Sequence, residues 1–146
     1  MLQQLIYMSA ATDLFTPPDL EDILARSRRN NAAVGLTGLL IFHDGNFLQV
    51  LEGEPDRVRA CYQRITGDRR HSGCLALPAT ERADRQFGAW DMAYLPFAEL
   101  APACRNSFID LKHLRRSGKM QELAQDETAR VFVKTFLESF RDSRLL

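Results

Sequence analysis

Apolar positions in the first 95 residues switch between the two-residue spacing of strands and the three-to-four-residue spacing of helices. Strands are expected at residues 2–9, 37–43, 47–51, 73–77 and 90–95. One helix should begin at Thr16-Pro17-Pro18-Asp19, where a threonine cap, prolines and an acid favour a first turn, and end near Asn30. A second should begin at Pro55-Asp56. The inward faces of these helices are expected to comprise Leu20, Ile23, Leu24 and Ser27 in the first, and Val58, Cys61, Tyr62 and Ile65 in the second.

The order of these elements predicts the fold class. Asp44-Gly45 between the second and third strands is a strong signal for a two-residue hairpin. The order is then βαββαβ with an extra fifth strand, which is the ferredoxin-like α+β pattern with two helices on one face of a mixed sheet. Pro96 and Pro102 mark a boundary, so we expect one domain at residues 1–97 and a C-terminal helical extension at residues 98–146.

The extension is expected to hold helices near residues 103–115 and 126–141. The second of these carries an apolar stripe, formed by Phe132, Val133, Phe136, Leu137 and Phe140. The stripe would either cap the far side of the sheet or bind a partner. Capping is favoured, because a large exposed apolar stripe would promote aggregation.

Composition narrows the possible functions. Lys and Arg number 19, as do Asp and Glu, so the formal net charge is zero, and neither nucleic acid nor an anionic membrane is an expected partner. No apolar run approaches the roughly 20 residues of a membrane span, and no leader peptide is evident at the N-terminus. The three cysteines, Cys61, Cys74 and Cys104, form no metal-binding motif, which suits free thiols in a reducing cytoplasm and predicts no metal site.

No phosphate-binding loop, dinucleotide fingerprint or nucleophile motif is present, so candidate chemistry rests on polar residues at positions expected to be buried. Gln49 shares a strand face with two apolar residues, and its amide must find partners, for example Tyr7 if the first strand is adjacent. Ile23 and Ile65 would face each other across the two helices, with polar groups beside them. This arrangement would admit a flat heteroaromatic ring, although an ordinary core with one satisfied Gln–Tyr pair remains an alternative.

Several stretches together resemble the BLUF family, which senses blue light using flavin. They occur in the family's order over residues 2–97. They are Leu5-Ile6-Tyr7-Met8-Ser9, Ser27-Arg28-Arg29-Asn30-Asn31, Leu36-Thr37-Gly38-Leu39-Leu40, Gly45-Asn46-Phe47-Leu48-Gln49-Val50-Leu51-Glu52-Gly53, Asp68-Arg69-Arg70-His71 and Arg85-Gln86-Phe87-Gly88-Ala89-Trp90-Asp91-Met92.

The resemblance implies a ferredoxin-like domain that holds oxidised flavin, usually FAD, between its two helices. Tyr7 resembles the photochemical tyrosine, Gln49 the switching glutamine, and Trp90 and Met92 the strand residues that relay the signal. The implied cofactor-binding residues are Ile23, Ser27, Asn30, Asn31, Gln49, Arg64, Ile65, Asp68, Arg70 and His71. Light would draw an electron and a proton from Tyr7 through Gln49, whose changed amide would red-shift the flavin absorption.

The chain resembles the short class of the family, so we expect a light-sensing signalling protein and not an enzyme. Its output would pass through a homodimer or higher oligomer, or through an effector such as a cyclic-nucleotide or cyclic-dinucleotide enzyme or a transcriptional regulator. Two alternatives remain open: a ferredoxin-like acyl-phosphate hydrolase, and a flavin-free protein-interaction module.

Overall fold

The computed structural model describes residues 1–88, 91–116, 131, 134–135 and 138. It forms two compact units, Met1–Leu95 and Pro96–Leu146. The assignment of residues 1–97 and 98–146 to separate domains stays a prediction.

The first unit is built on one sheet, in which strands are ordered β4-β1-β3-β2-β6 and β5 pairs with β1. The strands are β1 (Leu2–Ala11), β2 (Thr37–His43), β3 (Asn46–Gly53), β4 (His71–Ala76), β5 (Thr80–Arg82) and β6 (Ala93–Tyr94). Only the β2–β6 pair among these is parallel. The order around the central β1–β3 pair confirms the ferredoxin-like α+β prediction.

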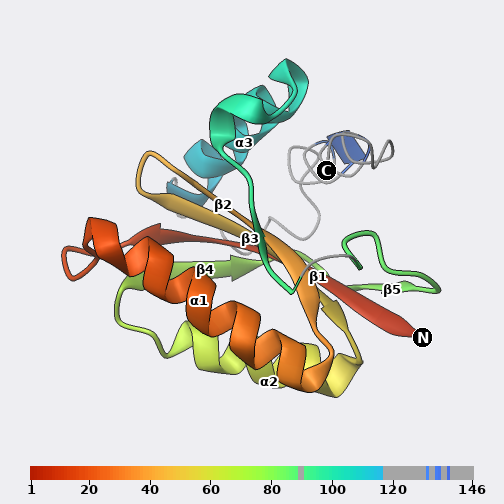
Figure 1. The fold of residues 1–146 in the computed structure, drawn as a ribbon. Coiled ribbons are helices and arrows are strands. Elements are labelled where there is room, and N and C mark those ends of the chain that lie inside the picture. The colour runs from red at the N-terminus through yellow and green to blue at the C-terminus, as the bar shows by residue number, and fades with distance from the viewer. Residues whose placement is uncertain (89–90, 117–130, 132–133, 136–137, 139–146) are drawn as a thin grey trace. The chain divides into compact units, whose positions relative to one another are not determined.

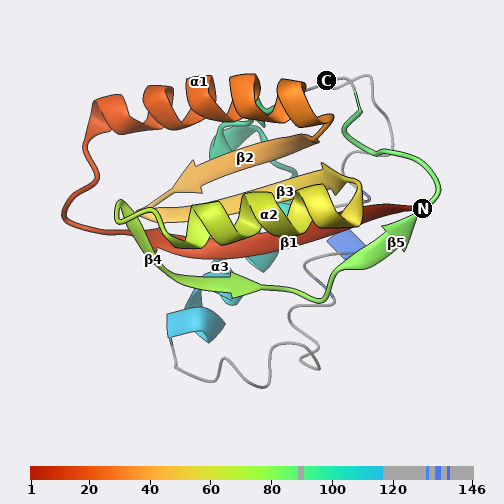
Figure 2. The same ribbon diagram turned by 90° about the horizontal axis from the view of Figure 1, so that it is seen from below.

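Helices α1 (Pro17–Val34) and α2 (Pro55–Thr66) cover the same face of this sheet, as Figures 1 and 2 show. The start of α1 is stabilised as expected, because the Thr16 amide donates to Asp19 Oδ2 at 2.6 Å. The helix continues past Asn30 to Val34 and ends at Gly35, whose φ of 70° suits glycine.

The core lies between the helices and the sheet. Its buried members are Leu5, Leu24, Leu36, Leu40, Phe47, Leu51, Val58, Cys61 and Met92. Both predicted inward helix faces contribute, since Leu20, Ile23, Tyr62 and Ile65 pack against this cluster while half-buried. Burial of these side chains therefore sets which face of each strand points toward the helices.

Strand register brings the two central candidate residues together. The predicted hairpin forms at Asp44 and Gly45, whose φ angles of 48° and 73° are those of a turn that matches strand twist. The antiparallel β1–β3 pair then places Tyr7 directly opposite Gln49. Residues directly opposite share a sheet face, so both side chains point toward the helices.

The structure departs from the sequence predictions at the sheet edges. Strand β5 was not predicted, because its three residues are mostly exposed and carry no apolar alternation. The last strand was expected at residues 90–95, but β6 spans only Ala93–Tyr94. The apolar stripe at residues 132–140 and the helix expected at 126–141 fall outside the described residues, apart from isolated helical positions.

The second unit contains η1 (Phe97–Glu99) and α3 (Pro102–Arg116), and the latter confirms the helix expected near residues 103–115. The Phe97 and Phe108 rings meet edge to face with centroids 5.3 Å apart. The Arg105 guanidinium donates to the Ala98 carbonyl at 3.1 Å. In the described part of the chain, no helix is long and apolar enough to cross a membrane.

Candidate functional site

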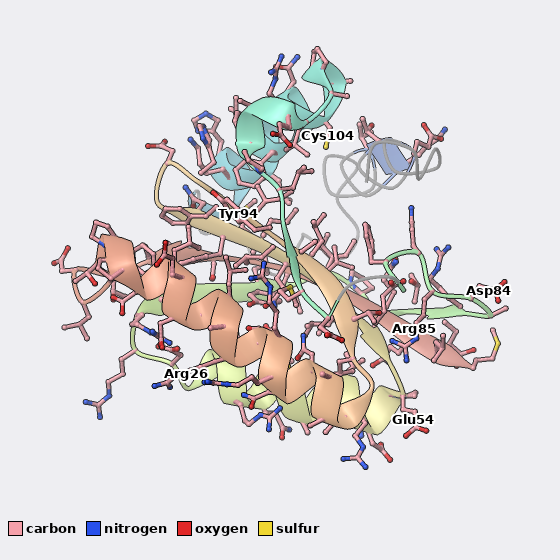
Figure 3. All side chains as sticks on the ribbon, in the orientation of Figure 1. Arg26, Glu54, Asp84, Arg85, Tyr94 and Cys104 are labelled. Atoms are coloured by element: carbon pink, nitrogen blue, oxygen red, sulfur yellow. The ribbon has the colours of Figure 1, made fainter. Side chains whose placement is uncertain are left out.

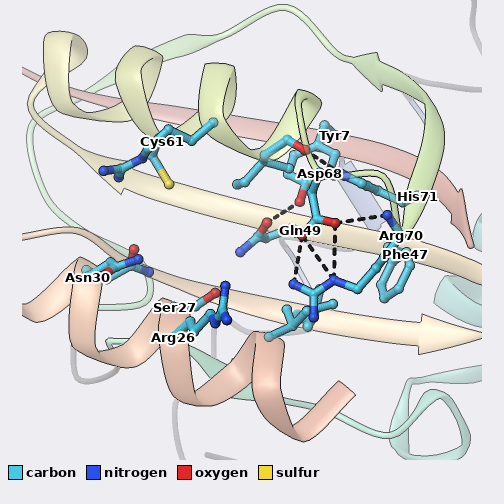
Figure 4. A pocket seen from close by; sticks show the side chains of 15 residues that line it. Tyr7, Arg26, Ser27, Asn30, Phe47, Gln49, Cys61, Asp68, Arg70 and His71 are labelled. Carbon is cyan, nitrogen blue, oxygen red and sulfur yellow. Dashed lines mark hydrogen bonds and ion pairs between the residues drawn. The ribbon is translucent and has the colours of Figure 1, made fainter. Parts of the chain in front are cut away.

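A cavity of about 220 Å³ opens between α1 and α2, above the centre of the sheet. Figure 4 shows Arg26, Ser27 and Asn30 reaching it from α1, with Cys61 on α2 opposite. Its lining residues come from both helices, from β1, β2 and β3, from the first residue of β4 and from the turn that leads into it. They are Tyr7, Ile23, Arg26, Ser27, Asn30, Asn31, Leu40, Phe47, Gln49, Cys61, Arg64, Ile65, Asp68, Arg70 and His71.

A buried Tyr–Gln pair borders the cavity. The Tyr7 hydroxyl donates a short hydrogen bond to Gln49 Oε1, and each residue is only 3% exposed. Burial raises the pKa of the Tyr7 phenol well above its ordinary value. Tyr7 is therefore a protonated hydrogen-bond donor at every physiological pH.

The other end of the Gln49 amide points at Met92. Gln49 Nε2 donates to Met92 Sδ at 3.5 Å, and Met92 is 2% exposed. Methionine therefore occupies the inward position beside the glutamine. Trp90, the other predicted relay residue, lies outside the described residues.

Two side chains of α1 hold the backbone around Met92. Asn31 Nδ2 donates to the Asp91 carbonyl at 2.7 Å, and Arg28 Nε donates to the Met92 carbonyl at 2.9 Å. Because Asn31 also lines the cavity, one amide connects the cavity wall with the segment that precedes β6.

The mouth of the cavity carries an ion-pair network centred on Arg70. Its guanidinium lies 2.7 Å from Asp68, 2.9 Å from Asp22 and 3.4 Å from Asp19. The hydrogen bond from Arg70 is the largest cause that lowers the pKa of Asp68, and Asp68 in turn raises the pKa of Arg70. The network ties α1 to the turn that leads into β4, which fixes the separation of two cavity walls.

His71 is oriented by a bond at each ring nitrogen. Nε2 lies against the Ile65 carbonyl, which can only accept, so this nitrogen carries the hydrogen. Nδ1 lies 2.8 Å from the Ser9 hydroxyl. The two contacts fix the position of the ring at the cavity edge.

The structure gathers all ten cofactor-binding residues expected from the sequence around this one cavity, together with Tyr7. What each contributes to binding stays a prediction. Sequence reasoning did not assign Arg26, Leu40, Phe47 and Cys61 to the site. Leu40 and Phe47 were recoverable, because Leu40 pairs with Gln49 across β2–β3 and Phe47 shares its strand face. Arg26 carried no signal, since it resembles any surface arginine.

The lining fits a flat heteroaromatic ring system. Ile23 and Ile65 would contact the faces of such a ring from opposite helices, while the amides of Asn31 and Gln49 would present hydrogen-bonding groups to its edge. A volume of about 220 Å³ is below the roughly 300–1,000 Å³ of sites that enclose whole drug-sized ligands. A larger ligand would therefore insert its ring and leave the rest at the mouth, where Arg26 and Arg64 lie. Among the described residues no cluster of metal-ligating side chains occurs.

Comparison with known families identifies the class. Residues 2–93 match the family model BLUF, described as sensors of blue-light using FAD. This covers more than half of the 146 residues, and the chain belongs to the BLUF family. Members of this family are flavin-binding photoreceptors that act in signalling, which confirms the expectation of a light-sensing signalling protein.

The chain is similar to several characterised proteins. It is 29% identical over 137 residues to the blue light- and temperature-regulated antirepressor BluF of Escherichia coli, a match that covers 94% of this chain and 33% of that protein. It resembles the dark-state structure of BlrB, a BLUF protein, with 26% identity and a TM-score of 0.69 over 94% of this chain and 96% of BlrB. It also resembles Klebsiella pneumoniae BlrP1 with FMN and cyclic diGMP, with 27% identity and a TM-score of 0.65 over 94% of this chain and 35% of BlrP1.

The chain therefore spans about a third of the length of BluF and of BlrP1, but nearly all of BlrB. The activities of the longer proteins as wholes do not transfer with the match.

Proposed function

We propose that the chain is a blue-light receptor in which Tyr7 and Gln49 change the hydrogen bonding of a non-covalently held flavin. One observation carries the proposal: the buried Tyr7 hydroxyl donates to Gln49 Oε1 at the edge of a cavity that fits a flat ring. A glutamine between a phenol and a ring can turn its two chemically different ends, so the same side chain supports two hydrogen-bond patterns.

The expected cofactor is FAD. The enclosed part of the cavity takes the ring system, while Arg64 and Arg26 at the mouth suit the phosphates of the tail. The similar protein BlrP1 has been solved with FMN, so FMN is the other flavin to be tested. The remaining implied contacts are Ile23, Ser27, Asn30, Asn31, Ile65, Asp68, Arg70 and His71.

When bound, the flavin supplies an oxidising excited state on absorbing blue light. Tyr7 gives up an electron, and its phenol then becomes strongly acidic. Its proton passes along the existing hydrogen bond to Gln49 Oε1. The electron would return to Tyr7 from the flavin that took it and the proton from the Gln49 side, which would leave the amide in a changed rotamer or tautomer, with no covalent bond formed and nothing consumed. Because burial raises the pKa of Tyr7, the phenol does not release its proton before it is oxidised.

The rearranged amide no longer offers the same donor to Met92 Sδ, which stands 3.5 Å from Nε2 in the resting arrangement. The output is then a shift of Met92, and of Trp90, the other relay residue that the family resemblance implies, and it passes to β6 and to the C-terminal helices. We expect a homodimer or higher oligomer and an effector protein, either a cyclic-nucleotide or cyclic-dinucleotide enzyme or a transcriptional regulator. The expected location is the cytoplasm.

The test is an absorption spectrum of the purified protein in the dark and after blue light. We expect a flavin spectrum that shifts to the red and recovers in the dark. Tyr7→Phe should keep the flavin and lose the shift. Tyr62→Phe is the matched control, because its ring lies 5.3 Å from Tyr7 and it removes a hydroxyl that has no role in the proposal.

A red shift of normal size in Tyr7→Phe would overturn the mechanism. A protein that stays colourless after refolding with FAD would overturn flavin binding. In that case the interaction module would remain, or the acyl-phosphate hydrolase if phosphate is released from an acyl phosphate.

A further inference from the structure

A second buried polar group lies on β3, three residues beyond Gln49. Glu52 is 1% exposed, and because side chains alternate along a strand it points to the sheet face opposite Gln49. Its Oε2 accepts from Gln4 Nε2 at 3.0 Å and from the Gln86 amide at 2.9 Å. Its Oε1 accepts from the Phe87 amide at 2.6 Å. One carboxylate therefore binds two successive backbone amides of the loop that follows β5.

Arg85, labelled in Figure 3, strengthens the same connection from the loop side. Its guanidinium donates to the Gly35 carbonyl at 2.6 Å, and to Thr37 Oγ1 and the Glu52 carbonyl at 2.9 Å each. Residues 85–87 are thus bonded to the residue that ends α1, to the start of β2 and to the end of β3.

The segment that runs from residue 86 to residue 92 therefore meets β3 twice. At its start, the Gln86 amide donates to Glu52 Oε2. At its end, Met92 Sδ accepts from Gln49 Nε2. Residues 89 and 90 lie between these ends, outside the described residues. Both contacts depend on one strand, but their chemistry differs.

The two ends differ in strength. Hydrogen bonds to a carboxylate are roughly twice as strong as those between neutral groups, and the amides of residues 86 and 87 donate two of them. A thioether is a weak acceptor, so the bond between Gln49 and Met92 is the weaker end. A perturbation at Gln49 releases the Met92 side chain, while the Asp91 and Met92 carbonyls stay bonded to Asn31 and Arg28 and the start of the segment stays bonded to Glu52.

We infer that Glu52 is a positioning residue for signal output: it fixes the start of the 86–92 segment, so that a displacement of Met92 passes onward to residues 93–95. The inference rests on the proposed function and deepens it, since it assigns the direction in which the change leaves the site. Without the attachment, the loop before Met92 would move as well and absorb part of the displacement.

The experiment compares Glu52→Gln with Glu54→Gln in the full chain by amide hydrogen exchange, in the dark and under blue light. Glutamine keeps the size of glutamate but presents an NH2 group to one of the two backbone amides, so that one hydrogen bond is lost. Glu54 is the matched control, because it is exposed on the same stretch of chain and its side chain makes no capping hydrogen bond.

In the dark, with or without flavin, Glu52→Gln should raise the exchange rates of the Gln86 and Phe87 amides about tenfold, the factor expected for loss of one such bond. Under light, the wild type should change exchange at residues 92–95 and leave 86–87 unchanged. In Glu52→Gln the light-induced change should spread to 86–88 and weaken at 93–95. The red shift of the flavin should keep its wild-type size, because Tyr7 and Gln49 are untouched.

Three results would overturn the inference: light-induced change at 86–87 in the wild type, a Glu52→Gln pattern identical to that of Glu54→Gln, or a wild type without any red shift. The last alone also removes the proposed function, which separates the two failures. If Glu52→Gln does not fold, Arg85→Lys decides in its place. A shortened cation cannot reach all three oxygens, so the spread to 86–88 should appear there in weaker form, and its absence would count against the inference.

Discussion

Two of the buried polar side chains of β3, Gln49 and Glu52, satisfy their hydrogen bonds in opposite ways. Gln49 is neutral and bonds only to other side chains, the Tyr7 hydroxyl and the Met92 sulfur. Glu52 is a carboxylate, and two of its three partners are backbone amides. Side-chain partners can turn without moving the chain, whereas backbone partners cannot. β3 thus carries the Gln49 amide, which can change its hydrogen-bond partners, and the Glu52 carboxylate, which cannot.

The comparison shows how a rigid sheet accommodates a switch. A buried neutral amide can exchange its donor and acceptor ends at low cost if its partners are also adaptable, and a hydroxyl and a thioether are both adaptable. A buried carboxylate has no such freedom, because its loss leaves several donors without an acceptor. A mutation of Glu52 should therefore mainly lower the free energy of unfolding, whereas a mutation of Gln49 should mainly remove the light-induced red shift.

The largest effect is expected for Glu52→Leu. Gln4 Nε2 and the amides of Gln86 and Phe87 all lose their acceptor, at roughly 1–3 kcal/mol for each buried donor, so the free energy of unfolding should fall by about 3–5 kcal/mol. Urea unfolding of the flavin-free protein measures this. A loss below about 1 kcal/mol would remove the contrast with Gln49.

A smaller loss of stability, with complete loss of light response, is expected for Gln49→Leu. Leucine fills a similar volume, and only the Tyr7 hydroxyl loses a strong partner, at about 1–2 kcal/mol. The variant should stay yellow while its red shift disappears, which absorption spectra before and after illumination would measure. A persistent red shift would show that the glutamine is not the group that changes.

The smallest effect is expected for Arg70→Gln at the cavity mouth, where half-exposed ion pairs contribute about 0.5–1 kcal/mol. Arg70 lowers the pKa of Asp68 below its ordinary 3.8 in the folded chain. The contribution of the Arg70–Asp68 ion pair to the free energy of unfolding is thus fully present above pH 3.8. It is lost as the pH falls through the lowered pKa of Asp68. The stability difference between wild type and variant should be constant near pH 7 and shrink below pH 4 in thermal unfolding scans. A difference that grows on acidification would show that the carboxylates are not the partners that matter.

Most of the helix-covered face could be predicted from the sequence, because its information is local. The two-residue period of residues 47–51 placed Gln49 on the same face as Phe47 and Leu51, and Asp44-Gly45 predicted the hairpin. Since both faces of this strand are apolar, the pattern left open which of them meets the helices. The prediction that Tyr7 lies near Gln49 required only that β1 lie beside β3, which the ferredoxin-like order implies. The resemblance to the BLUF family then supplied roles that spacing alone does not contain.

The sheet edges and the Glu52 contacts could not be predicted in the same way. Glu52 bonds to Gln86 and Phe87, more than 30 residues away in a loop without periodicity, so no local pattern announces the pairing. Strand β5 is held by backbone pairing with Leu2, Gln3 and Gln4, which leaves no trace in side-chain pattern. Arg70 likewise gathers its acids from two separate elements.

Asn31 couples the affinity of the cavity for a ligand to the position of residues 91 and 92. Its amide lines the cavity and also holds the Asp91 carbonyl. If a ligand binds more tightly when residues 91 and 92 are held, then holding those residues from outside must tighten the ligand by the same factor, since coupling free energies are reciprocal. An effector that binds residues 91 and 92 and holds them in place would thereby raise the affinity of the protein for its flavin.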